Sequence, residues 1–224
     1  MRSDPLAERA SGRGLEEILA GVRDRLKAVE HALAAAARVP EIPLLQSILQ
    51  SILLAPAKRL RPALVILACD LLGVAGDDPV RLAAGTEVLH SATLVHDDIV
   101  DAANARRGRP TAHVQWSEQA AVLAGDFLFA TSADLVAQLD RPRIVRLFAH
   151  TIHRISRSEF ISPTGEGDLA TVYEQYLAKI GDKTASLFAL GCDAAAELAD
   201  PPDEQRHALH EYGWSLGVAF QMAD

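Results

Sequence analysis

The chain has 224 residues, of which 49% are hydrophobic and only 5% aromatic, and its formal net charge is −8. This length suits one domain with a sizeable core. The acidic balance argues against non-specific nucleic-acid binding, so an anionic ligand would have to be held by a local basic patch or by metal ions. Ala and Leu are prominent and favour helices over strands, so we expect an all-α fold.

The cysteines and the hydropathy pattern bear on location. Cys69 and Cys192 lie far apart and form no CxxC pattern, which argues against a disulfide framework or a zinc site and fits a reducing compartment. The polar first residues lack an apolar signal-peptide core, and no uncharged run reaches membrane-spanning length. We therefore expect a cytoplasmic protein without an integral membrane segment.

Short breaks rich in Gly, Pro, Asn and Asp divide the chain into helical stretches. The predicted helices cover residues 14–37, 43–54, 61–72, 79–101, 112–139, 143–161, 169–198 with a break at Gly181, and 203–224. No alternating strand pattern is seen. Because the connections are short, we expect an antiparallel helical bundle that forms a single domain over 1–224.

The predicted helix at 79–101 carries polar residues along one side of an otherwise apolar surface. Apolar residues spread around most of its circumference, as in a helix buried inside a bundle. His90, Asp97 and Asp101 recur at spacings of seven and four, which places them along one stripe, with Asp98 beside them. Buried carboxylates are costly unless they are paired or bound to metal, so this stripe predicts the wall of a polar cavity.

The carboxylates and the arginines that follow them predict a diphosphate site. Asp97 and Asp101 point the same way one helical turn apart, and like charges at that spacing repel. A hard divalent cation removes the repulsion, and magnesium commonly binds one or two carboxylates together with substrate phosphates. Arg106 and Arg107 come just past the helix end, where guanidinium groups can grip phosphate oxygens.

A DDxxD pattern alone is a weak signal. Asp77 and Asp78 in the same chain read as a solvated loop and helix cap. The double arginine and the buried character of the preceding helix favour a site at Asp97 over a solvated face.

Several motifs together resemble the trans-isoprenyl diphosphate synthases, the polyprenyl synthetase family. The resemblance runs from about Lys58 to the end of the chain. The matching segments are KRLRP at 58–62, EVLHSATLVHDDIVD at 87–101, RRGRPTAH at 106–113, AVLAGDFLFA at 121–130, KTASLF at 183–188 and GVAFQMAD at 217–224. Their number and order make the resemblance specific, whereas each motif alone is not.

The resemblance implies an all-α isoprenoid synthase bundle that depends on Mg²⁺. Its members condense an allylic diphosphate with isopentenyl diphosphate, head to tail, to give a longer trans-polyprenyl diphosphate. The allylic carbon–oxygen bond breaks, the double bond of isopentenyl diphosphate attacks the cation, and a proton is lost. A homodimer is also implied. The protein's part is mainly positioning and electrostatic preorganisation.

The resemblance assigns the metal ligands residue by residue. Asp97 and Asp101 match the magnesium ligands of the first aspartate-rich motif, and Asp98 is the third carboxylate there. Asp224 matches the first aspartate of the second such motif, where the sequence stops. We therefore expect a fragment of a longer protein, lacking the rest of that motif and the C-terminal helices.

The resemblance also assigns the substrate-binding residues. Arg106 matches the contact to the allylic diphosphate. Lys58, Arg61, His90 and Arg107 match the group that binds the diphosphate of isopentenyl diphosphate. Taken singly, Lys58 and Arg61 are typical of an exposed helix start and His90 of a satisfied core histidine; together they predict a cationic pocket.

Lys183, Thr184 and Gln221 resemble the family's catalytic residues. Lys183 would balance charge on the allylic diphosphate, while the Thr184 hydroxyl and the Gln221 amide oxygen would face the developing carbocation. In place of the family's usual glycines before Lys58, this chain has Ala55, Pro56 and Ala57.

Two alternatives stay open at this point. A class I terpene cyclase also uses an aspartate-rich helix with magnesium, but it binds no second diphosphate, and the cationic group argues against it. A non-catalytic partner subunit of a heteromeric prenyl synthase is the other alternative. The intact first motif argues against that reading, and the incomplete second motif argues for it.

Overall fold

The computed structural model of the protein describes residues 14–161 and 168–223. Its helices are α2 (Leu15–Ala20), α3 (Arg23–Ala36), α4 (Pro43–Leu53), α5 (Leu60–Leu71), α6 (Asp78–Val100), α7 (Ala112–Gln115), α8 (Glu118–Ala137), α9 (Pro142–Glu159), α10 (Leu169–Ile180), the π-helical turn η1 (Gly181–Ala185), α11 (Ser186–Ala199) and α12 (Asp203–Ala223). Two short strands, β1 (Ala105–Arg106) and β2 (Arg109–Pro110), follow α6. The predicted all-α bundle is confirmed.

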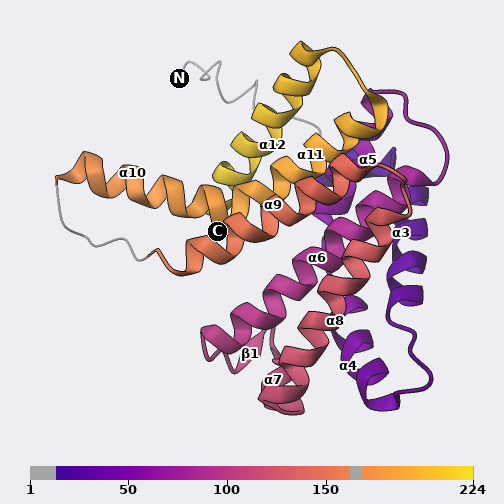
Figure 1. The fold of residues 1–224 in the computed structure, drawn as a ribbon, viewed down its shortest axis with the longest axis vertical. Coiled ribbons are helices and arrows are strands. Elements are labelled where there is room, and N and C mark those ends of the chain that lie inside the picture. The colour runs from indigo at the N-terminus through magenta and orange to yellow at the C-terminus, as the bar shows by residue number, and fades with distance from the viewer. Residues whose placement is uncertain (1–13, 162–167, 224) are drawn as a thin grey trace, which may run out of the picture.

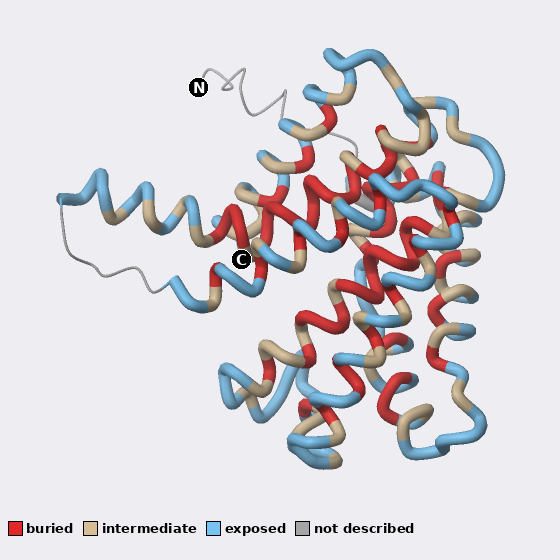
Figure 2. The backbone as a smooth tube through the Cα atoms, viewed as in Figure 1, coloured by how far each residue is buried: buried red, intermediate tan, exposed pale blue. Residues whose placement is uncertain are grey.

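Helix α6 occupies the centre of the bundle, where it packs against α3, α5, α8 and α11 (Figure 1). Small and apolar residues lie on all sides of it, and buried positions follow one another from Leu82 to Leu89 (Figure 2). Helix α11 is buried over most of its length as well. Towards its C-terminal end α6 becomes less buried: His90 and Asp97 are partly buried, whereas Asp101, just after the helix, is exposed.

Two predicted helices are each divided in the structure. The helix expected over 14–37 ends at Ala20 and resumes at Arg23. The helix expected over 112–139 is interrupted after Gln115, and α8 begins where the Ser117 side chain accepts a hydrogen bond from the backbone N–H of Ala120 at 3.1 Å. Serine is a strong N-cap residue, so this local signal decides the second break.

The loop after α6 forms a two-stranded ribbon, contrary to the expectation of no strand. Ala105 pairs with Pro110 and Arg106 with Arg109. The two turn residues, Arg107 and Gly108, have φ angles of 51° and 74°, the positive values that tight hairpin turns require. This ribbon fixes both arginines of the double-arginine motif beside the end of α6.

A π-helical turn joins α10 to α11, beginning at Gly181, where the sequence predicted a break. Helix α10 projects away from the body of the bundle (Figure 1), and among its residues only Ile180 is buried. π-Helical turns are rare, and those that occur are often found at functional sites. Lys183 and Thr184 both lie in this turn.

Within the described residues, α8 alone is long and apolar enough to cross a membrane by length and composition. One such helix is weak evidence for a membrane segment, because core helices pass the same test. Helix α8 lies along α6 and carries Asp126 and Asp134. Its outer side exposes apolar residues, among them Val122 and Leu123, which are 38% and 59% exposed.

Candidate active site

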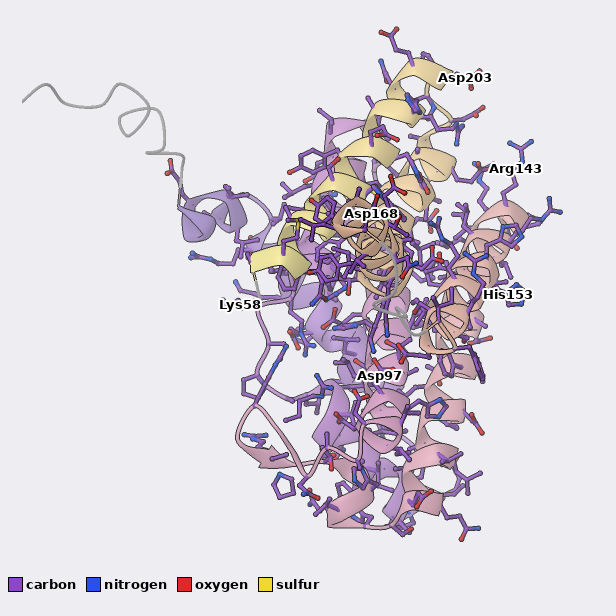
Figure 3. The ribbon with its side chains drawn as sticks, turned by 90° about the vertical axis from the view of Figure 1, so that its left-hand side faces the viewer. Lys58, Asp97, Arg143, His153, Asp168 and Asp203 are labelled. Carbon is purple, nitrogen blue, oxygen red and sulfur yellow. The ribbon has the colours of Figure 1, made fainter. Side chains whose placement is uncertain are left out.

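A cavity of about 850 Å³ opens between the start of α5, the C-terminal half of α6, the β1–β2 ribbon, η1 and α12. It gathers most of the residues that the sequence singled out from distant parts of the chain. These are Lys58, Arg61, His90, Asp97, Asp101, Arg106, Arg107, Lys183, Thr184 and Gln221. In Figure 3, Lys58 lies at the edge of the molecule opposite Arg143 and His153 of α9, and Asp97 lies between these two edges.

Asp97 and Asp101 form the acidic part of the cavity. Asp101 follows the last residue of α6, and its backbone N–H donates to the carbonyl of Asp97 at 2.8 Å. Burial raises the pKa of Asp97; Lys183 opposes this, while Glu159 and Asp101 add to it. The carboxylates therefore disfavour one another's charge, which a bound cation would relieve.

Asp98 lies apart from these two and contacts Arg106, while its assignment to the metal site remains a prediction. Its side chain is 10% exposed and does not line the cavity. Oδ1 of Asp98 accepts a hydrogen bond from Nε of Arg106 at 2.8 Å, and Nη2 of Arg106 lies 2.8 Å from the same oxygen in an ion pair. Successive helical residues point about 100° apart, so Asp98 cannot share the face of Asp97. It orients Arg106. Asp224 lies outside the described residues.

The donor set fits magnesium. Among the described residues, no group of three or more His, Cys, Asp or Glu side chains could hold a metal ion by itself. Two carboxylates, Asp97 and Asp101, nevertheless face one cavity that also contains several cations. Magnesium is commonly bound by one or two carboxylates, with substrate phosphates completing the coordination. The site is thus suited to a metal that arrives with a diphosphate.

The cationic part of the cavity is centred on Arg61 and His90. Nη1 of Arg61 lies 3.1 Å from Nε2 of His90, and the Arg61 guanidinium carbon lies 4.5 Å from the centre of the Phe188 ring. Burial lowers the pKa of Arg61 to about 10. Nε of Arg61 is buried without a hydrogen-bond partner. An arginine with an unsatisfied donor is prepared to bind an anion.

His90 stays neutral beside these arginines. Burial lowers its pKa well below 6.5, and the positive charges of Arg61 and Arg107 lower it further. Arg107 is anchored separately, because its Nη1 donates to the carbonyl of Pro56 at 3.0 Å. This bond ties the ribbon to the segment just before Lys58.

Arg59 supports the cationic part, and the sequence reasoning missed it. It is 9% exposed, has a φ of 50°, and contributes to the cavity wall. Its guanidinium donates to Glu30 at 2.6 Å, to Glu87 at 2.8 Å and to the carbonyl of Leu53 at 2.6 Å. The available signal was Glu87, a carboxylate three residues before His90 on the buried helix.

Lys183 and Thr184 of η1 and Gln221 of α12 line the same cavity. Nζ of Lys183 lies 3.7 Å from Oδ2 of Asp97 and 2.7 Å from Oε1 of Glu159. Thr184 donates its hydroxyl proton to Oε1 of Gln221 at 2.7 Å. Glu159 at the end of α9 was not predicted, because no spacing along the chain relates it to Lys183.

The family model described as polyprenyl synthetase matches residues 42–224. The chain belongs to the polyprenyl synthetase family. It is 40% identical over 185 residues to a prenyl transferase of Synechocystis sp., covering 81% of this chain and 57% of that protein.

Solved structures of polyprenyl synthetases have the same fold. A decaprenyl diphosphate synthase from Rhodobacter capsulatus superposes with a TM-score of 0.86 at 35% identity, covering 92% of this chain and 63% of that one. A polyprenyl synthase from Caulobacter crescentus complexed with calcium and isoprenyl diphosphate gives 0.85 at 32% identity, with the same coverages. The chain thus spans just over half the length of the curated relative and less than two thirds of these structures.

Proposed function

We propose that this chain provides the catalytic bundle of a trans-polyprenyl diphosphate synthase, which condenses an allylic diphosphate with isopentenyl diphosphate. One observation carries the proposal. One cavity is lined by the carboxylates Asp97 and Asp101, with Lys183 3.7 Å from Asp97, and also by a cationic group that comprises Lys58, Arg61, His90 and Arg107. Two anionic groups can therefore be bound side by side, one with metal and one by cations alone.

In the proposed site, Asp97 and Asp101 hold Mg²⁺ with the allylic diphosphate. When bound, the metal would supply Lewis-acid stabilisation of the leaving diphosphate. Lys183 and Arg106 add positive charge there. Support for a divalent metal also comes from the Caulobacter crescentus relative, whose structure contains calcium and isoprenyl diphosphate.

The remaining residues would position the second substrate and the developing charge. Arg61, Lys58 and Arg107 would supply the positive charge that binds the diphosphate of isopentenyl diphosphate. Because Thr184 donates its proton to Gln221, the lone pairs of the Thr184 hydroxyl remain available to face positive charge. The two oxygen dipoles would stabilise the allylic cation between the substrates.

Two assembly and location proposals accompany this function. The exposed apolar side of α8, including Val122 and Leu123, supports a homodimer, since such patches mark interaction surfaces. The described cysteines, Cys69 and Cys192, are free and buried, which supports the reducing cytoplasm.

The experiment is incorporation of labelled isopentenyl diphosphate by the full-length protein with allylic primers and Mg²⁺. Labelled product of greater chain length is expected. Cyclic hydrocarbon formed without incorporation would point instead to a terpene cyclase. Incorporation that requires a second, different chain would point to a partner subunit.

A further inference from the structure

Consecutive residues of η1 make ion pairs of opposite sign with α9. Asp182 accepts from Nε of Arg154 at 2.9 Å and from Nη2 of Arg157 at 2.5 Å. The next residue, Lys183, places its Nζ 2.7 Å from Glu159, two positions after Arg157 on the same helix. Because the signs alternate, sliding η1 along α9 would bring like charges together. The register between the turn and the helix is therefore specified electrostatically.

Asp182 is charged and enclosed by this arrangement. Its side chain is 11% exposed. Burial alone would raise the pKa of Asp182, but hydrogen bonds from Arg157 and Arg154 outweigh burial and hold the pKa below its ordinary value. A charged, enclosed carboxylate with two guanidinium partners is a strong and directional contact.

The packing around Arg154 extends the contact to α12. The Arg154 guanidinium carbon lies 4.6 Å from the centre of the Trp214 ring. A Cβ added at Gly181 would lie 2.6 Å from Cζ2 of Trp214. Only glycine allows the indole this close to the start of the turn. Trp214 therefore packs against η1 and also contacts Arg154 by a cation–π interaction, which favours the position of Arg154 beside the turn.

The shape of the turn determines where Lys183 points. A π turn contains one residue more than an α-helical turn, so conversion to α-helix would rotate one flanking segment by about 100°. Helix α11 is buried in the core, and the rotation would therefore fall on η1 and α10. Lys183 would then move away from Asp97 and Glu159.

We propose that Asp182 is a positioning residue for the cavity. Held by Arg154 and Arg157, it keeps η1 in the π-helical form that aims Lys183 at Asp97 and Thr184 at Gln221. None of Asp182, Arg154 and Arg157 lines the cavity, so the effect is indirect. The importance of Lys183 here rests on the function proposed above.

The test compares Asp182→Asn, which keeps the size and removes the charge, with Asp182→Glu, which keeps the charge. Asp70→Asn is the matched control, because Asp70 on α5 pairs with Arg25 on α3 and does not line the cavity. Binding of inorganic pyrophosphate in the presence of Mg²⁺ is measured by calorimetry. We expect Asp182→Asn to weaken binding by about tenfold or more, because Lys183 would no longer be held where it can contribute its charge to the bound diphosphate. Asp182→Glu should restore most of the affinity, and Asp70→Asn should bind like the wild type.

Crystal structures of the wild type and of Asp182→Asn decide the proposal independently of ligand binding. We expect the variant to lose the π turn and the Lys183–Glu159 contact. An unchanged turn in the variant would overturn the proposal. If the wild type binds magnesium pyrophosphate, an unchanged affinity of the variant would overturn it as well. If the wild type itself fails to bind magnesium pyrophosphate, the proposed function loses its support, and the turn in the variant alone decides the role of Asp182. Should Asp182→Asn not fold, Arg157→Gln, which removes one of the two partners, replaces it in both measurements.

Discussion

Arg61 and His90 are joined by a hydrogen bond, in which Nη1 of Arg61 lies 3.1 Å from Nε2 of His90. The arginine can only donate, so Nε2 of the imidazole accepts and the ring proton resides on Nδ1. A protonated imidazole would place two donors face to face. This geometry agrees with the lowered pKa of His90, which follows from burial and from the charge of Arg61.

The neutral state of His90 predicts a specific pH dependence of stability. In the unfolded chain, histidine gains a proton below a pH of about 6.5. Because the folded-state pKa lies well below that, the unfolded state binds more protons in this window, and stability falls as the pH decreases. We expect the free energy of unfolding to fall more steeply between pH ~7 and pH ~5 in the wild type than in His90→Gln. Urea titrations at several pH values measure this, and parallel curves would contradict it.

The buried ion pair of Arg59 with Glu87 predicts a large effect on stability. Both side chains are less than a tenth exposed, at 9% and 7%. Glu87→Gln leaves part of a buried positive charge uncompensated, although Glu30 still pairs with Arg59. We expect a loss of about 2–3 kcal/mol in the free energy of unfolding. As a control, Asp78→Asn removes a largely solvent-screened pair with Arg81 and should cost less than about 1 kcal/mol. Equal effects from both variants would show that the burial of Glu87 contributes nothing.

The sequence predicted those features that depend on spacing along one element. Asp97 and Asp101 share a helical face because they are four residues apart, and both line the cavity. The cationic residues were placed by their motifs, and the structure brings them to the same cavity. The central, buried position of α6 followed from the absence of a polar face over most of its length.

The missed features depend on contacts between elements. Glu159 and Arg154 are on α9, and their relation to η1 arises only when the two segments pack. Nothing in the sequence predicted the left-handed backbone conformation of Arg59 and Arg107, since arginine does not favour positive φ. Helical spacing places Asp98 beside the stripe of Asp97 and Asp101, but only the structure shows that it pairs with Arg106.

The two carboxylates of the acidic part predict metal-dependent ligand binding. We expect Asp97→Asn and Asp101→Asn each to lower condensation by about a hundredfold or more, because charge stabilisation of the leaving group is lost. Each should also abolish the enhancement of pyrophosphate binding by Mg²⁺.

Asp126→Asn on α8 is the control, since its side chain is 63% exposed and does not line the cavity. Circular dichroism should show an intact fold throughout. Near-normal activity of either variant at saturating magnesium would remove the metal role.

The residues one helical turn before Asp97 lead to a prediction about what limits the chain length of the product. Ala92 and Thr93, both small, are candidates for the floor of an elongation tunnel beside α6, and Phe127, Leu128 and Leu135 are candidates for deeper stops. The structure separates the first two: Thr93 lines the cavity, whereas Ala92 is fully buried and does not. Neither Phe127, Leu128 nor Leu135 reaches the cavity wall. The hydroxyl of Thr93 donates to the carbonyl of His90 at 2.8 Å, which holds the side chain against its own helix and leaves the space beside it open.

Replacing Thr93 by a bulky aromatic should therefore block elongation. Thr93 precedes Asp97 by four residues and shares its face, so Phe at this position would project beneath a diphosphate bound at Asp97. We expect the wild type to make products longer than farnesyl diphosphate and Thr93→Phe to make shorter ones, as resolved by chromatography of the dephosphorylated alcohols. Ala92→Phe is the matched control: it overpacks the core and should cost about 1–3 kcal/mol of stability. If Ala92→Phe shortens the products and Thr93→Phe does not, the growing chain runs along the other side of α6.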